Sequence, residues 1–402
     1  MTRTHYIYIA FALLALHMPA GAQDVLRLRP RYEAVLQSVA RNNTALKVAA
    51  KQNEAQLYRL QASRRLPDPE AEVAWLAGSP KGVPNRTNVT VTQQLDWGVL
   101  TGRRGAAAKA GKETLALRLA AENARVLAAA DRALLELVYR NKLCAEMRLR
   151  AANAREVETV FEKRYARGDA SLPDLNKARL AAAVARADER RAESARAEAE
   201  SELSRLAGGA DVAYPDTLYA TAGDSLPPLQ ELLALVGGGA AVRLAEGEAQ
   251  QSLAEGAVAR AEAWPTLTAG FMGEYIKGNN YSGASVGFSL PLWGGGRKRA
   301  RQKTAEAAAW RIGADGTRRQ LAGDVARQYR AAADLLLAQA QLAAGIAAAD
   351  NTALLRRSLE EGRITLLDYL TESTLSREAR VSWLETERDA QAALARLRSL
   401  LR

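Results

Sequence analysis

The sequence predicts an α+β membrane protein built from two copies of one plan, in which a helix leads into a β-hairpin and the hairpin into a long helix. Two observations carry this prediction. A strand-to-helix turn occurs twice, at residues 95–104 (Leu-Asp-Trp-Gly-Val-Leu-Thr-Gly-Arg-Arg) and at residues 291–299 (Pro-Leu-Trp-Gly-Gly-Gly-Arg-Lys-Arg). Each turn follows an alternating, strand-like segment and precedes a run rich in Ala, Arg, Glu and Leu. A repeat of this kind indicates a duplicated architecture.

The repeat extends well beyond the two turns. Four pairs of residues keep the same offset along the chain, namely Arg103/Arg297, Gly168/Gly362, Ser171/Thr365 and Asp174/Asp368. Two independent Ala-rich helical regions are the alternative, and they do not explain these matches. We therefore expect a first repeat over 23–207 with a hairpin at 70–97, a linker over 208–228, and a second repeat over 229–402 with a hairpin at 266–291.

Residues 1–22 have the pattern of a cleaved secretory signal peptide. A basic start is followed by an apolar run over 6–16 and by Ala20-Gly21-Ala22, which fits a cleavage site. No Cys follows this site, so we expect no lipid anchor at the mature N-terminus. We expect no other stretch to approach the ~20 apolar residues that a membrane helix needs.

The supply of histidine and cysteine limits the chemistry of the mature chain. Both histidines, His5 and His17, lie in the expected signal peptide, and Cys144 is the single cysteine. This excludes His-based catalytic triads and cages of His or Cys around a metal. We expect no enzyme activity, no cofactor and no metal site, and we expect Cys144 to be a buried structural thiol.

The formal net charge of +11 comes from charges of both signs that alternate along the helices. Residues 188–193 and 385–389 mix acidic and basic side chains, as is typical of a solvated helix face. A nucleic-acid-binding surface would need a segregated basic stripe with stacking aromatics. We therefore expect no nucleic-acid partner.

The elements follow in order from the local pattern. A broad apolar face predicts one helix over 31–66, which Pro67 ends. Period-two alternation predicts strands over 70–77, 87–97, 266–277 and 281–291, each with one apolar and one polar face.

Two runs without proline, 103–165 and 292–402, predict very long helices. A helix of some 60 residues is on the order of 90 Å long, so neighbouring helices must support it. Tight reversals near Gly168 and Gly362 fold each run into a helical hairpin, and each reversal restarts with the capping-box spacing Ser171-x-x-Asp174 or Thr365-x-x-Asp368.

Four strands of this length fit a bilayer when tilted, but four strands cannot close a membrane barrel alone. Several copies of the chain must therefore pool their strands. Two copies would give a filled barrel of eight strands, and three would give twelve and room for a channel. The alternative is a periplasmic coiled coil with β-caps, whose exposed apolar sheets would aggregate.

These features together resemble the TolC-type outer-membrane efflux family over essentially the whole mature sequence. The resemblance rests on the duplicated plan, on the turns Trp97-Gly98 and Trp293-Gly294, and on a tip pattern in which Asp follows Gly by six residues. Tyr165 also fits this pattern, whereas its counterpart Leu359 departs from it. The stretches 66–70 (Leu-Pro-Asp-Pro-Glu) and 93–96 (Gln-Gln-Leu-Asp) are similar to the heavy-metal cation-efflux branch of the family.

The resemblance implies a homotrimer in the outer membrane of a Gram-negative bacterium. Its twelve-stranded transmembrane β-barrel would continue into a long periplasmic α-helical tunnel that docks to a periplasmic adaptor and an inner-membrane pump. The tips would close the channel and meet the adaptor, which gives candidate site residues Tyr165, Arg167, Gly168, Asp174, Gly362, Arg363 and Asp368. Many relatives carry a second acid three residues after the last of these; here it is Thr371, which implies a weaker acidic constriction.

The strand-to-helix turns form the second candidate site, with residues Trp97, Gly98, Arg103, Arg104, Trp293, Gly294, Arg297, Lys298 and Arg299. Cations at a helix N-terminus oppose the helix macrodipole, so another interaction should favour them. One hypothesis is contact with anionic lipid headgroups; the other is a solvated collar.

We therefore expect a passive exit channel of a tripartite efflux system. Two other functions stay open: a dedicated heavy-metal duct, and a structural protein that joins the periplasm and the outer membrane without conducting.

Overall fold

The computed structural model describes residues 28–95, 98–220, 226–289 and 295–401, which belong to two compact units. The helical unit combines Met1–Lys47, Glu122–Gly239 and Arg319–Arg402. The sheet unit combines Val48–Ala121 and Ala240–Arg318. The expected signal peptide over 1–22 lies outside the described residues.

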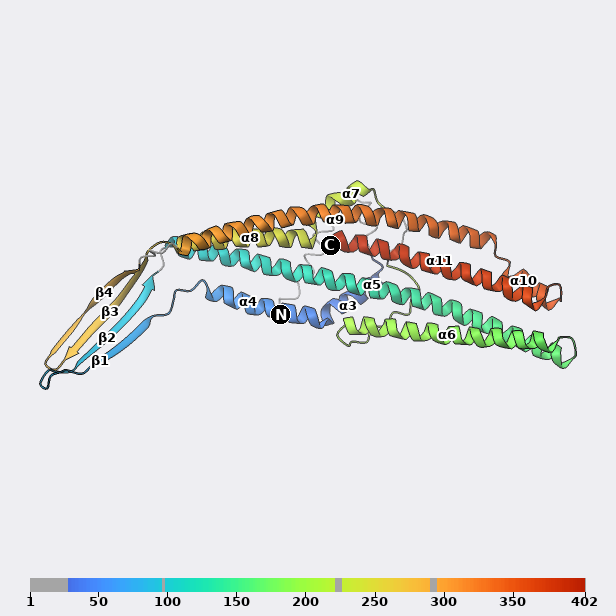
Figure 1. Ribbon diagram of the computed structural model, residues 1–402, viewed down its shortest axis with the longest axis horizontal. Helices are drawn as coiled ribbons and strands as arrows, with labels where there is room; N and C mark the ends of the chain where they lie inside the picture. Colours follow the sequence, from blue (N-terminus) through green and yellow to red (C-terminus); the bar gives the residue numbers. More distant parts are fainter. Residues whose placement is uncertain (1–27, 96–97, 221–225, 290–294, 402) are drawn as a thin grey trace. The chain divides into compact units, whose positions relative to one another are not determined.

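Four antiparallel strands form one sheet in the sheet unit, in the order β1-β2-β3-β4 (Figure 1). Their bounds agree closely with the expected strands, and the two hairpins, far apart in sequence, join through β2 and β3. Pairing therefore leaves β1 and β4 as the two edges of the sheet. The strands are β1 (Glu70–Leu76), β2 (Arg86–Leu95), β3 (Thr266–Ile276) and β4 (Asn279–Ser289).

The strand register gathers the apolar side chains on one face of the sheet. Val91 stands opposite Phe271, and Phe271 stands opposite Ala284, so these residues share a face. On this face the side chains of Val73 and Phe288 are 69% and 67% exposed in the protomer. The other face is polar, and Arg86 and Glu274 form an ion pair on it at 2.9 Å. The expected two-faced alternation is thus confirmed, with its apolar face uncovered.

The helices of the sheet unit pack closely because small residues lie between them. α8 (Ala240–Ala261) meets the first part of α5 (Gly98–Ala166) at Gly247, where an added Cβ would lie 2.6 Å from Leu117 Cδ1. The Thr114 hydroxyl donates to the Gly247 carbonyl at 3.1 Å, which holds the two backbones together.

The helical unit contains α3, α6, α7, α10, α11 and the later parts of α5 and α9 (Figure 1). α6 runs back beside α5, and ion pairs such as Arg186–Glu158 at 3.1 Å join them. The helices are α3 (Pro30–Asn42), α4 (Thr44–Ala62, mostly in the sheet unit), α6 (Leu172–Leu206), α7 (Leu229–Leu235), a 3-10 turn (Val236–Gly238), α9 (Gly295–Ala348), α10 (Thr352–Glu360) and α11 (Leu366–Leu401).

Two of the expected continuous helices are in fact broken. The helix expected over 31–66 divides at Asn43, whose side-chain amide donates to the Leu206 carbonyl at 2.8 Å and whose Oδ1 accepts from the Leu46 amide at 3.1 Å. The second long run breaks between α9 and α10, where Asp350 accepts from the Thr352 hydroxyl at 2.8 Å. In both places a polar side chain supplies a local alternative to the helical hydrogen bonds.

A buried polar cluster lies within the core of the helical unit. Asp131 and Arg398 pair at 3.2 Å with side chains 2% and 0% exposed, and the Tyr32 hydroxyl donates to Asp131 at 2.6 Å. Burial, and then the Asp131 charge, raise the pKa of Tyr32 well above its ordinary value. Cys144 is buried beside Met147 and Ala192, as expected for a structural thiol.

One described helical stretch, within Gly295–Glu360, is long and apolar enough to cross a membrane by length and composition alone. The expectation that no such stretch follows the signal peptide was therefore wrong. Only 6% of that stretch is buried within the protomer, so it lacks the buried surroundings of a core helix.

Candidate functional site: the helical tips and the strand-to-helix turns

The two helical tips have the same backbone geometry. The Gly168 amide donates to the Tyr165 carbonyl at 3.0 Å, and the next amide, of Asp169, donates to the Arg164 carbonyl at 2.8 Å. The second tip repeats this pair of bonds, from Gly362 and from the residue after it. This is the Schellman arrangement that ends a helix, and it needs a left-handed residue. Gly168 and Gly362 meet that need with φ angles of +80° and +70°.

Each tip restarts its helix with a capping side chain. The Asp174 amide donates to Ser171 Oγ at 3.2 Å, and the Asp368 amide donates to Thr365 Oγ1 at 3.1 Å. Asp368 also accepts from the Thr365 amide at 3.1 Å, which completes a reciprocal capping box.

Hydrogen bonds hold the carboxylates of the two tips in their charged form. The bond from the Ser171 hydroxyl, followed by that from Lys177, lowers the pKa of Asp174. The Thr365 hydroxyl and then its backbone amide lower the pKa of Asp368. Both carboxylates are therefore engaged in capping, and both lie at the solvent-exposed ends of their helices.

One arginine joins the two tips. Arg164, at the end of α5, donates through Nη2 to the carbonyls of Leu359 and Glu360 at 3.1 and 2.7 Å. A second link lies about two turns away, where Arg356 and Glu156 pair at 2.8 Å. An apolar cluster beneath these links buries Phe161, Leu175, Ala178, Leu359 and Leu366.

The basic residues expected at the gate, Arg167 and Arg363, form no described bond between the two tips, in contrast to Arg164. Arg363 pairs with its neighbour Glu361 at 2.8 Å and is 73% exposed. The Tyr165 side chain is 44% exposed, and Arg167 forms no ion pair among the described residues. Sequence reasoning missed Arg164 because its role depends on carbonyls in the other repeat.

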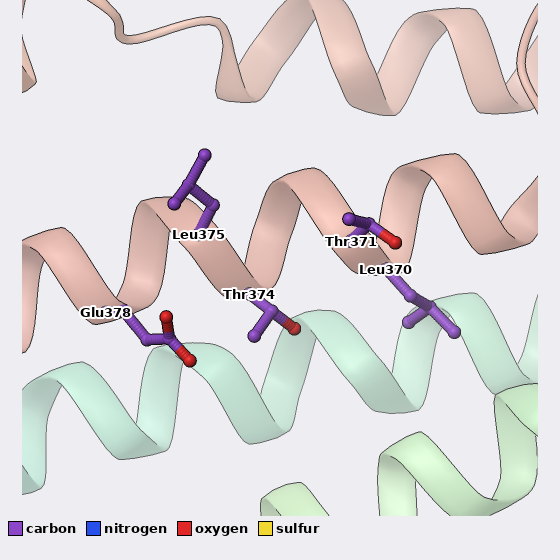
Figure 2. Close-up of a pocket in the computed structure, with 5 residues that line it drawn as sticks. All are labelled: Leu370, Thr371, Thr374, Leu375 and Glu378. Carbon is purple, nitrogen blue, oxygen red and sulfur yellow. The ribbon is translucent and has the colours of Figure 1, made fainter.

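Thr371, the position at which the family resemblance implies a second acid, lies on a shallow pocket along α11 (Figure 2). Its hydroxyl donates to the Leu367 carbonyl at 2.9 Å, so the hydroxyl proton already has an acceptor within α11. Two turns further along, Glu378 lines the same pocket and is 65% exposed. This is an acid that the tip pattern did not include.

Near the strand-to-helix turns, one carboxylate forms ion pairs with two of the basic residues predicted for this site. Glu262, just after α8, lies 3.7 Å from Arg104 of α5 and 3.5 Å from Arg299 of α9. Its two oxygens thus offset part of the positive charge at both helix starts. Arg297 and Lys298 are exposed, and no ion pair between described residues includes them.

Gly98 and Gly295 begin α5 and α9, as the turn pattern predicts for glycines at these junctions. Trp97, Trp293 and Gly294 lie outside the described residues, so their predicted part in the turns stays a prediction. Among the residues that the structure describes, no group of three or more His, Cys, Asp and Glu side chains could hold a metal ion.

No profile of a known protein family matches the sequence, and no curated protein sequence does either. Solved structures do match. CusC superposes with a TM-score of 0.75 at 15% identity, over 96% of this chain and 95% of its own. The CmeC outer-membrane channel of Campylobacter jejuni gives 0.74 at 15% identity, over 92% and 85%. The MtrE outer-membrane channel of Neisseria gonorrhoeae gives 0.70 at 19% identity, over 92% and 89%.

The matches span nearly the whole chain on both sides, so they include the helical hairpins and the sheet together. The chain has the fold of the TolC-type outer-membrane efflux channels.

Proposed function

We propose that this protein is the outer-membrane exit channel of a tripartite efflux system. Three copies pool their sheets into a twelve-stranded transmembrane barrel, and their helices continue it as a periplasmic tunnel. The chain performs no chemistry, and substrates pass through it after an inner-membrane pump and a periplasmic adaptor deliver them. Residues 1–22 direct export, and the two repeats over 23–207 and 229–402 each supply one hairpin and one tip.

The observation that carries this proposal is the sheet itself. Its apolar face is uncovered, its other face is polar, and its two edge strands have no partner within the described part of the protomer. A bilayer satisfies the apolar face, water in a lumen satisfies the polar face, and neighbouring copies satisfy the edges. The names of the matched structures, which include outer-membrane channels, support the same location.

Single-channel recording in planar bilayers tests the proposal. The purified full chain should give discrete conductance steps, because a barrel of twelve strands leaves an aqueous lumen. A structural protein without a pore would insert or adsorb without such steps. Silent bilayers, obtained with protein that light scattering shows to be fully assembled, would contradict the channel.

The proposal assigns the choice of substrate to the pump. The polar face of the sheet would line a wide lumen with threonine, asparagine and glutamine side chains, among them Thr90, Thr92, Gln94 and Thr268. Such a lining has no chemistry specific for one substrate. A heavy-metal duct would be the same channel with a different pump.

A further inference from the structure

A pocket of about 410 Å³ opens at the junction between strands and helices in the sheet unit. It lies between the first turns of α5, which follow β2, and the last turn of α8, which precedes β3. Its wall combines two kinds of side chain, with Arg103 and Arg260 on the charged side and Val99, Leu100 and Trp264 on the apolar side.

The described lining of the pocket includes two cations and no acid. No ion pair there includes Arg103 or Arg260, although both line one pocket. The neighbouring Arg104 and Arg299 differ, because Glu262 pairs with both of them. Two guanidinium groups that line one pocket without a carboxylate are suited to bind an anion such as phosphate, because each planar guanidinium can donate paired hydrogen bonds to two of its oxygens.

The apolar wall is unusually open to solvent. Trp264 is 66% exposed and Val99 is 68% exposed, whereas Leu100, which also lines the pocket, is buried. An indole that presents its apolar ring beside cationic groups is typical of the boundary between membrane and water. The ligand that fits both walls has an anionic head joined directly to hydrocarbon.

The place of the pocket along the strands agrees with such a ligand. Leu95 pairs with Leu267 at the helix-facing end of the sheet. Trp264 comes three residues before Leu267, and Arg103 comes eight residues after Leu95, in the first turns of α5. If the sheet spans the outer membrane, as the proposed function holds, this end lies at the depth of the periplasmic leaflet's headgroups. The membrane depth of the pocket therefore rests on the proposed function, whereas the shape and the charge of the pocket do not.

We propose that the pocket binds an anionic glycerophospholipid of the periplasmic leaflet. Arg103 and Arg260 hold the phosphodiester, and Trp264 and Val99 pack against the glycerol and the first methylenes of an acyl chain. This replaces a diffuse basic collar with one defined lipid site in each protomer, and it adds Arg260 and Trp264 to the residues that recognise the membrane.

Native mass spectrometry of the assembled full-length protein tests this site. The probes are phosphatidylglycerol and phosphatidylcholine with the same acyl chains, and inorganic phosphate as a competitor. The parent should retain one phosphatidylglycerol per protomer. The double variant Arg103→Gln/Arg260→Gln should weaken that retention about tenfold or more, since each cation near an anionic lipid contributes about 1 kcal/mol. Trp264→Ala should weaken retention of both lipids.

The matched control is Arg297→Gln/Lys298→Gln, which removes two cations from the equivalent turn of the other repeat. It should leave phosphatidylglycerol retention within twofold of the parent. Equal loss in both double variants would show a diffuse collar, and no loss in either would show that the pocket binds no lipid. Displacement of the lipid by millimolar phosphate would assign the site to a free anion, and dissociation of the double variant in lipid-free detergent would make the pocket a subunit contact. Each of these four results overturns the proposal.

Recording from the same parent sample separates this proposal from the proposed function. A parent that conducts but retains no phosphatidylglycerol would contradict the lipid site alone. A parent that neither conducts nor forms an oligomer would contradict the channel, and with it the membrane depth assigned to the pocket.

Discussion

At the scale of single residues, the protein places a charged pair where most proteins place leucine. Arg398 is completely buried, and its Nη2 donates to Asp131 Oδ2 at 3.2 Å, while the Tyr32 hydroxyl donates to Oδ1 of the same carboxylate. Removing one member of a buried pair leaves the other as an uncompensated charge, which costs about 3–5 kcal/mol. Arg398→Gln should therefore lower the free energy of unfolding by about this amount, measured by urea unfolding followed by circular dichroism.

The control for that variant lies two residues earlier in the same helix. Arg396 is exposed, so Arg396→Gln should change the free energy of unfolding by about 0.5 kcal/mol or less. Equal effects of the two substitutions would mean that the buried pair contributes nothing beyond helix propensity.

The capping carboxylates give a second prediction at this scale, which concerns pH. The fold lowers the pKa of Asp174 and of Asp368, so their stabilising effect is complete above the ordinary carboxyl pKa of about 4. It is lost only as the pH falls through the lowered folded values. Hydrogen-exchange protection of the Asp174 and Asp368 amides, corrected for intrinsic rates, should stay constant from pH 5 to pH 8 and fall in stronger acid. A loss of protection near pH 6 would contradict this assignment.

At the scale of elements, the two helical hairpins are joined at their tips by Arg164. If the tips close the resting channel, as the resemblance in sequence implies, this link should hold them together. Arg164→Gln removes the cation that binds two carbonyls of α10, so the time-averaged conductance should rise severalfold. Planar-bilayer recording at matched protein amounts measures the change.

Arg167→Gln is the matched control for the tip link, because it removes the same charge from the same tip without breaking a described ion pair. It should conduct like the parent. If both variants open equally, net charge at the tip, rather than the Arg164 bonds, holds the gate. If neither opens, the link lies outside the gate.

The same elements explain what the sequence could and could not predict. Strands were predicted within a few residues, because alternation and the glycine turn at Gly278 are local signals. The tip turns were predicted for the same reason. The break at Asn43 was missed because the carbonyl that holds its amide is at Leu206, distant in sequence. Arg164, Arg260 and Glu262 were missed because each acts through a neighbour that only the tertiary fold provides.

At the scale of the whole molecule, the two edge strands of the sheet, β1 and β4, call for partners outside the protomer. The proposed trimer supplies them by joining β1 of one copy to β4 of the next. Light scattering of detergent-extracted protein, corrected for bound detergent, should give the mass of three protomers. A stable monomer that keeps its β signal in circular dichroism would contradict this prediction.

The two unpaired edges described above also have a genetic consequence. β1 and β4 are different strands, so each interface of the proposed trimer pairs the β1 of one copy with the β4 of the next. One copy whose β4 cannot pair therefore prevents the barrel from closing. If a copy whose β4 cannot pair is expressed in equal amount with the parent, random mixing leaves roughly one ring in eight with three sound seams. Such an allele should therefore be dominant, and efflux in cells that carry both genes should fall far below half.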